Sequence, residues 1–210
     1  TDNIINDVKR CQFLFTDLIS EIGVPVKMFD DAVVRISRVI CFMINDAPQN
    51  SFLQGYDRLA TVSFALALHF SLRIQLSLIE AEAFAVVLLR HLVTLCEAAE
   101  FLTNPNLSMQ YYVNLDAFLM QHNLELMQTL NKGDFRSEHF AANWVGSLFN
   151  DCHKPLDTLF IWDFMILNKM DVSNITKALV SSHLDQIENN EDPSTVISNI
   201  MSYQDWDVER

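Results

Sequence analysis

The sequence predicts an all-α fold, and three observations carry this prediction. Only 4 Gly and 5 Pro occur among 210 residues, so the turns that strands and hairpins need are scarce. Half of the residues are hydrophobic, and they recur at the three- and four-residue spacing of amphipathic helices. A chain of this length and composition can bury a core of its own. We therefore expect a single helical domain over residues 1–210, with about eight to ten helices.

The first clear helix has apolar residues at helical spacing, namely Val33, Ile36, Ile40 and Ile44. It should end near Asn45, because Pro48 follows and the residue before a proline avoids the α region. Residues 46–51 then form a short loop.

Two further stripes predict amphipathic helices in the middle of the chain. The first stripe consists of Phe84, Val87, Leu88, Leu92 and Leu95, and the second of Leu115, Phe118, Leu119, Leu126 and Leu130. Breaks are expected at residues 104–106 and 131–134, which are rich in Asn, Pro and Gly. The residues that we expect to be largely buried are Phe84, Leu88, Leu92, Phe118, Leu119, Trp144 and Trp162.

Two helices are expected near the end of the chain. The first has apolar positions at Val172, Ile175, Leu179 and Val180. The second opens at Asp192-Pro193, which fits an N-cap followed by proline in the first helical position. It continues through Val196, Ile197 and Ile200, and the acidic residues 188–192 before it form a linker.

Charge and composition exclude several classes of protein. Lys and Arg number 14 against 27 Asp and Glu, a formal net charge of -13, which disfavours nucleic acid as a partner. The longest apolar stretch, residues 62–79, contains His69, Arg73 and Gln75, so no transmembrane helix is expected. No signal peptide is visible, and the chain resembles a fragment of a longer protein. Four scattered cysteines without a CxxC pair suit free thiols in the cytosol.

The usual motifs of self-contained active sites are missing. Neither an HExxH motif nor a Cys/His ladder is present, and Cys152-His153 stands alone, so no metal site is expected. His91, His122 and His183 lie on or beside apolar stripes, where partly buried rings with a structural hydrogen bond are expected. Phosphate-binding glycine loops and a GxSxG elbow are absent too.

Two short segments carry a more specific pattern. Residues 4–10 fit I-x-x-D-x-x-R, with Asp7 and Arg10 in the fixed positions. Residues 52–55, Phe-Leu-Gln-Gly, follow the helix that contains Val33 and its proline-containing loop. In order and approximate separation, these segments resemble the I-x-x-D-x-x-R and Y-x-Q-G-M elements of TBC-domain Rab GTPase-activating proteins.

The resemblance continues downstream, and it covers residues 4 to about 185. Residues 80–84 resemble the acidic start of a long helix in that family, residues 140–149 its aromatic helix, and residues 161–163 its I-W-D element. The remainder, residues 186–210, is expected to form a C-terminal helix and tail. We expect Trp144, Phe149 and Trp162 to serve packing, as large aromatics on helices usually do.

The sequence departs from the family pattern at three positions beside these motifs. Phe52 stands where tyrosine is usual, Tyr56 where methionine is usual, and Cys11 where threonine is common. The family's N-terminal helices, which carry an R-x-x-x-W segment, have no counterpart before Arg10. The resemblance therefore implies a TBC-like domain that lacks these helices.

The resemblance implies catalysis on a partner's nucleotide. Hydrolysis of GTP by a small GTPase is slow, and an arginine supplied in trans neutralises charge that develops on the phosphates. Arg10 is the candidate arginine finger, and Gln54 is the glutamine finger that would orient the attacking water. Asp7, three residues before Arg10, would aim the guanidinium, and Gly55 would let the backbone of Gln54 approach the partner. A Rab-type GTPase would bring the GTP and Mg²⁺, so the chain needs no cofactor of its own.

Two other interpretations remain open. The domain would be a Rab-binding module without activity if the departures beside Arg10 and Gln54 have removed catalysis. It would be a helical scaffold without a GTPase partner if Arg10 and Gln54 do not share one exposed groove. Asp7 and Arg10 would then form an ordinary surface pair, and Gln54-Gly55 a simple turn before a helix. In the GTPase interpretations the protein is cytoplasmic and reaches vesicle membranes peripherally through its partner.

Overall fold

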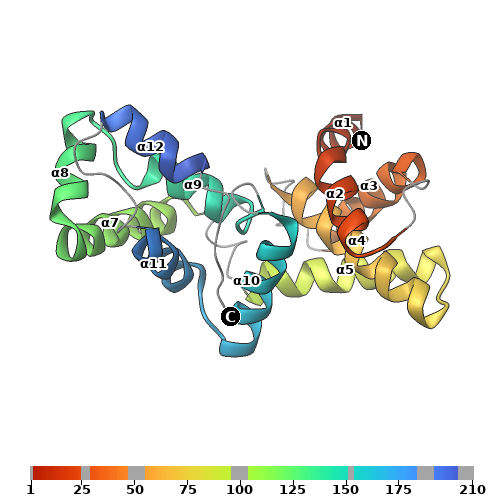
Figure 1. The fold of residues 1–210 in the computed structure, drawn as a ribbon. Helices are drawn as coiled ribbons and strands as arrows, with labels where there is room; N and C mark the ends of the chain where they lie inside the picture. Colours follow the sequence, from red (N-terminus) through yellow and green to blue (C-terminus); the bar gives the residue numbers. More distant parts are fainter. Residues whose placement is uncertain are drawn as a thin grey trace. The chain divides into compact units, whose positions relative to one another are not determined.

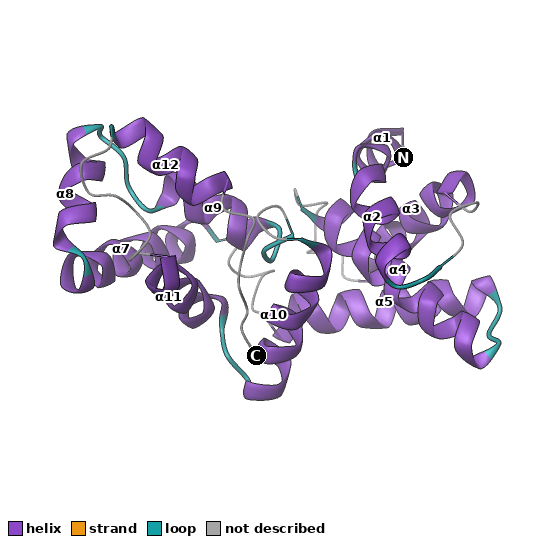
Figure 2. Cartoon of the chain, in the orientation of Figure 1, coloured by secondary structure: helices purple, strands orange, loops and turns teal. Residues whose placement is uncertain are grey.

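All regular structure in the described part of the chain is helical. The computed structural model describes residues 2–24, 29–46, 55–95, 104–150, 154–183 and 192–202. These ranges contain eleven helices and no strand (Figure 2). The all-α prediction is therefore confirmed. The helix number slightly exceeds the expected one, because the chain breaks at Cys11 and Asn123, where the sequence shows no glycine or proline.

The chain divides into two compact units, and the first comprises residues 1–94 (Figure 1). In it α1 packs on α3 and α4, while α4 also contacts α2 and α3. Fully buried side chains in its core include Phe15, Leu18, Ile36, Ile40, Leu59 and Phe64. The helices are α1 (Asp2–Arg10), α2 (Gln12–Glu21), α3 (Phe29–Asp46), α4 (Tyr56–Ile74) and α5 (Leu78–Leu95).

The second unit comprises residues 95–210. Its helix α8 packs on α7 and α12, and α11 lies against α7 and α9. The helices are α7 (Pro105–His122), α8 (Leu124–Lys132), α9 (Glu138–Gly146), α10 (Pro155–Asn168), α11 (Val172–His183) and α12 (Pro193–Ser202). The sequence prediction of a single domain over residues 1–210 stays a prediction.

Several helix boundaries lie where the capping residues predict them. Helix α3 ends at Asp46, shortly before Pro48, as expected. Helix α12 begins at Pro193, and the Asp192 carboxylate accepts a hydrogen bond from the backbone N–H of Ser194 at 3.1 Å. Helix α7 begins at Pro105, inside the break expected at residues 104–106, under an Asn104 cap that accepts from the N–H of Asn106. These ends depend on neighbouring residues alone, which is why the sequence predicts them.

The predicted buried face of α5 is wrong in part. Leu92 is fully buried, but Phe84 is 39% exposed, Leu88 is half-buried, and Val87 is exposed. The side that packs inward consists of Ala81, Ala85, Leu89, Leu92 and Val93. The helix is apolar almost all round, so hydrophobicity alone does not select a face. Phe84 lies against Phe70 of α4 near the surface.

The second predicted stripe belongs to two helices instead of one. Leu115, Leu119, Leu126 and Leu130 are buried as expected, but Phe118 is only half-buried. Asn123 ends α7, and its side-chain oxygen accepts from the N–H of Leu126 at 2.9 Å to cap α8. His122 is exposed and stacks on Phe118, and His91 is exposed as well, so neither ring is partly buried as expected.

The aromatic residues of the second unit do form its packing. Trp144, Phe149 and Trp162 are all buried, which confirms that expectation. The Trp162 indole N–H donates to the carbonyl oxygen of Leu148 at 2.9 Å, across the turn that follows α9. Leu148 and Phe149 both have positive φ, 46° and 71°, which side chains other than glycine rarely adopt. The surrounding contacts therefore hold a strained turn in place.

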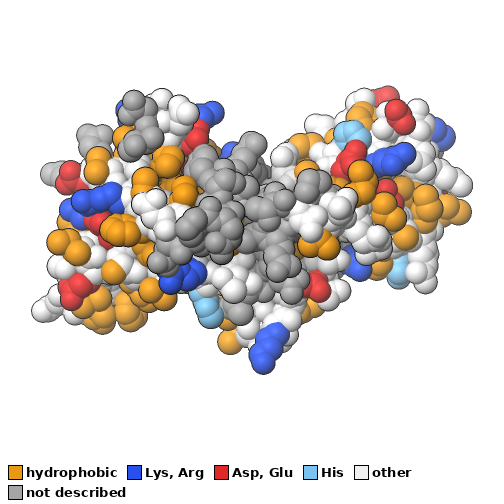
Figure 3. Space-filling view, turned by 180° about the vertical axis from the view of Figure 1, so that it is seen from behind, with side chains coloured by type: hydrophobic (Ala, Val, Ile, Leu, Met, Phe, Trp, Pro, Cys, Tyr) orange, Lys and Arg blue, Asp and Glu red, His pale blue; other side chains and the backbone are white. Residues whose placement is uncertain are grey.

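The surfaces of both units carry apolar side chains among charged ones (Figure 3). On α10 the exposed positions Leu156, Phe160, Phe164 and Leu167 repeat at helical spacing. None of the helices in the described residues is both long and apolar enough to span a membrane.

Gly133→Ala should destabilise the second unit. A Cβ at this position would lie 2.6 Å from the Cβ of Pro193 and 2.7 Å from the ring of Phe135. The proline ring is rigid and opens α12, so α12 must shift away from α8, at a cost of about 1–3 kcal/mol. Urea unfolding measures the effect, with Lys132→Ala on the exposed neighbouring position as the control. Equal stability of the two variants would contradict the tight contact.

Candidate functional site

Arg10 is the last residue of α1, and its side chain is 76% exposed. Its guanidinium donates a hydrogen bond to the Asp7 carboxylate, three residues earlier on the same helix, and the two form an ion pair. A cation in the last turn also interacts favourably with the helix dipole. The predicted pairing of Asp7 with Arg10 is thus present. A pair of this kind suits both a guanidinium held ready for a partner and an ordinary surface ion pair.

Cys11 lies between α1 and α2, and it is buried although its neighbour Arg10 is exposed. Its thiol donates to the Asp57 carboxylate, with an Sγ–Oδ2 distance of 3.4 Å, and its Sγ lies 3.6 Å from the carbonyl oxygen of Asp7. Burial, followed by the Asp57 charge, raises the pKa of the Cys11 thiol to about 12. The thiol therefore keeps its proton at neutral pH and acts as a donor.

Gly55 and Asp57 define the other side of the site, at the start of α4. Gly55 has φ 104°, in the left-handed region that favours glycine, and its carbonyl oxygen accepts the first helical bond from Leu59. Asp57 lies in the first turn, where a carboxylate faces the positive end of the helix dipole. Gly55 is buried, and its positive φ gives its lack of a side chain a role in the turn itself.

The predicted glutamine finger, Gln54, lies outside the described residues, as does Phe52. The residue next to Gln54, Gly55, is described, and so is the helix α4 that follows it. Helices α1 and α4 pack together, and the Cys11–Asp57 hydrogen bond joins the end of one to the start of the other. The structure therefore brings Cys11, the residue that follows Arg10, against the first turn of α4.

The structure describes two of the three residues that depart from the family pattern, Tyr56 and Cys11. Tyr56 is fully buried, and its hydroxyl has no hydrogen-bond partner among the described residues. Burial raises the pKa of its phenol. The residue thus fills the core as a large apolar group would. Cys11 presents a proton donor to Asp57, which is also what a threonine hydroxyl could present.

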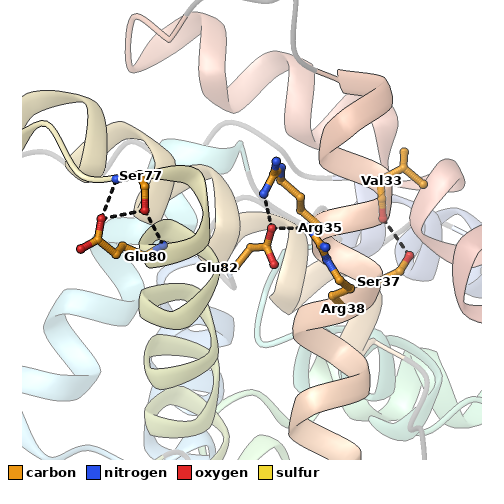
Figure 4. Close-up of polar contacts among 7 residues, drawn as sticks. All are labelled: Val33, Arg35, Ser37, Arg38, Ser77, Glu80 and Glu82. Carbon is orange, nitrogen blue, oxygen red and sulfur yellow. Dashed lines mark hydrogen bonds and ion pairs between the residues drawn. The ribbon is translucent and has the colours of Figure 1, made fainter.

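Elsewhere in the first unit, two arginines of α3 share one carboxylate of α5 (Figure 4). Arg35 and Arg38 both donate to the same oxygen of Glu82, whose side chain is largely buried. Glu80, two residues earlier, accepts from the backbone N–H and the hydroxyl of Ser77, both at 2.7 Å, and these bonds lower the pKa of its carboxyl. This capping box fixes the start of α5, and the shared ion pair fixes α5 to α3.

Sequence reasoning did not single out Asp57 or its contact with Cys11. The two residues are 46 positions apart, and no pattern in the sequence pairs a cysteine with a distant aspartate. The sequence indicated these residues only through their positions. Cys11 directly follows the I-x-x-D-x-x-R segment, and Asp57 comes two residues after Gly55.

The remaining candidate feature is the set of side chains that could bind a metal ion. No group of three or more His, Cys, Asp or Glu side chains that could hold a metal ion occurs there. Asp151, Cys152 and His153 lie outside the described residues.

Comparison with protein families identifies the family of the chain. A model described as the Rab-GTPase-TBC domain matches residues 7–188, which include Asp7, Arg10 and Trp162. Comparisons with curated proteins and with solved structures returned no match. The matched segment is most of the 210 residues, and its helical structure agrees with the family fold. The chain therefore belongs to the Rab-GTPase-TBC domain family, the family of Rab GTPase-activating proteins.

Proposed function

We propose that this chain accelerates GTP hydrolysis by a Rab-type GTPase, with Arg10 as an arginine finger and Gln54 as a glutamine finger. The GTPase supplies GTP and Mg²⁺. The chain supplies a permanent positive charge for the phosphate oxygens and an amide that orients the attacking water. It works in the cytoplasm, held peripherally at vesicle membranes by its partner.

One observation carries the proposal: a hydrogen bond joins a residue next to Arg10 with a residue three positions after Gln54. Arg10 precedes Cys11, and Cys11 donates to Asp57 in the helix turn that starts just after Gly55. Gln54 is one peptide bond from Gly55. Two side chains that must reach the same nucleotide need their backbones held near each other, and this link supports that requirement.

The state of Arg10 also supports the proposal. Its side chain is exposed, so a partner's nucleotide can reach it without unfolding of α1. The Asp7 carboxylate limits the orientations of the guanidinium before binding, which lowers the entropy lost on insertion. On binding, the fork of the guanidinium can turn from the carboxylate to phosphate oxygens.

The test is a panel of GTP-loaded Rab proteins, assayed for hydrolysis with and without the chain. Acceleration of at least one Rab supports catalysis. Binding of a Rab without acceleration favours the alternative, a Rab-binding module whose catalysis was lost through the departures at Phe52, Tyr56 and Cys11. If the chain neither binds nor accelerates any Rab in the panel, the result contradicts both the catalytic and the Rab-binding interpretation.

Gln54→Ala should lower the stimulated hydrolysis of a responsive Rab by about 10²-fold, because the amide orients the attacking water in the proposed mechanism. Single-turnover hydrolysis measures the loss, and binding of the Rab should change little. Gln54→Glu is the matched variant, since it keeps the size but lacks the amide donor, and it should lose activity too. Full activity of Gln54→Ala would mean that the Rab uses its own glutamine.

A further inference from the structure

The contact between Cys11 and Asp57 has properties that core packing does not require. Cys11 is buried, and its Sγ lies 3.4 Å from a carboxylate oxygen of Asp57 as well as 3.6 Å from the carbonyl oxygen of Asp7. Thr61, one turn further along α4, donates its hydroxyl to the backbone carbonyl of Asp57 at 2.7 Å. Asp57 is thus held at two points, through its side chain by Cys11, which directly follows α1, and through its backbone by Thr61 of α4.

The contact also lies at a special place in the chain. The carbonyl of Asp7, which faces the Cys11 thiol, belongs to the residue whose carboxylate holds Arg10. Asp57 lies in the helix turn that follows Gly55. A single buried thiol therefore connects the residues that support one proposed finger with the helix that follows the other.

We propose that Cys11 and Asp57 are positioning residues, which set the end of α1 against the start of α4 so that Arg10 and Gln54 reach one nucleotide together. This inference rests on the proposed function. Neither side chain touches the reacting atoms.

Stability and catalysis should respond differently to the loss of this contact. A thiol is a weak hydrogen-bond donor, so its bond adds little to the net stability of a unit that already packs α1 on α3 and α4. Catalytic geometry is much less tolerant, because a misplacement of 1 Å is enough to lower a rate by about 10². A small displacement of α1 would therefore leave the fold intact and reduce the stimulated rate.

The experiment compares Cys11→Thr with Cys11→Val in the full chain. The two side chains have nearly the same shape, and only threonine offers a proton to Asp57. With a responsive Rab, we expect Cys11→Thr to stay within about threefold of the parent, while Cys11→Val loses about tenfold in the single-turnover rate. Rab affinity and melting temperature should be the same for both. Cys41→Val, at the half-buried free thiol of α3, is the control and should change nothing.

Asp57→Leu supplies the second half of a double-mutant cycle. If the two residues act through one contact, adding Asp57→Leu to Cys11→Val should lower the rate little further. Independent, multiplied losses would overturn the proposal, as would equal rates for the threonine and valine variants.

A second readout needs no GTPase. Amide hydrogen exchange at residues 9–12 and 55–58 should be faster in Cys11→Val than in Cys11→Thr, with the rest of the first unit unchanged. Equal exchange in the two variants overturns the inference. A further outcome is that the parent chain accelerates no Rab while the variants still show the expected exchange difference. That result would overturn both the proposed function and the catalytic role of the Cys11–Asp57 contact, which would then be purely structural.

Discussion

Arg10→Ala should lower the stimulated hydrolysis of a responsive Rab by at least about 10²-fold, equivalent to roughly 2.7 kcal/mol of transition-state stabilisation. The physical reason is that the transition state spreads negative charge over the phosphate oxygens, and alanine leaves that charge without its cation. Complex formation should suffer less, because the charge develops fully only in the transition state. Single-turnover hydrolysis and Rab affinity, measured on the same samples, separate the two effects.

Two variants sharpen this test. Arg10→Lys should fail largely as well, since an ammonium is a point charge without the planar fork of the guanidinium. Lys9→Ala removes the neighbouring exposed cation of the same helix turn and should leave the rate nearly unchanged. A full rate with Arg10→Ala would contradict the arginine-finger role. Equal losses for Arg10→Ala and Lys9→Ala would mean that the two cations act only through general charge attraction.

Trp162→Ala should destabilise the second unit by about 3–5 kcal/mol. The indole is 3% exposed, so its removal deletes a large buried surface and leaves a cavity. It also removes the hydrogen bond to the carbonyl of Leu148, in the strained turn where Phe149 has positive φ. Chemical unfolding followed by circular dichroism measures the loss.

Trp162→Phe separates packing from hydrogen bonding. It keeps most of the ring but leaves the carbonyl of Leu148 without its donor, so a smaller loss of about 1–3 kcal/mol is expected. Phe160→Ala truncates an exposed aromatic residue on the same helix and should stay within about 0.5 kcal/mol of the parent. An unchanged melting temperature for Trp162→Ala would contradict its place in the core.

The fold was predictable where local chemistry decides it. The proline and capping signals at Asp46 and Asp192 predicted two helix ends, because capping involves residues a few positions apart. The face of α5 was not predictable, since Phe84 and Ala85 compete for the interior and only the packed neighbours decide between them. The turn at Leu148 was beyond prediction for a related reason: its positive φ is imposed by tertiary contacts.

The candidate site divides in the same way. The pairing of Asp7 with Arg10 follows from their spacing on one helix turn, and the structure contains it. The contact of Cys11 with Asp57 joins residues on different helices, so its prediction requires the fold. The role of Gln54 remains a prediction from the family resemblance, because the described residues begin again at Gly55.

The carboxylate that Arg35 and Arg38 share has a consequence for how this chain can change over generations. Loss of either arginine leaves Glu82 with one cation, whereas loss of Glu82 leaves two neighbouring cations that repel each other. A sequence can therefore lose one of the two arginines by a single substitution and regain it later. A change at Glu82 survives only beside a second, compensating change. Descendants of this sequence should therefore vary at the two arginine positions well before they vary at the glutamate.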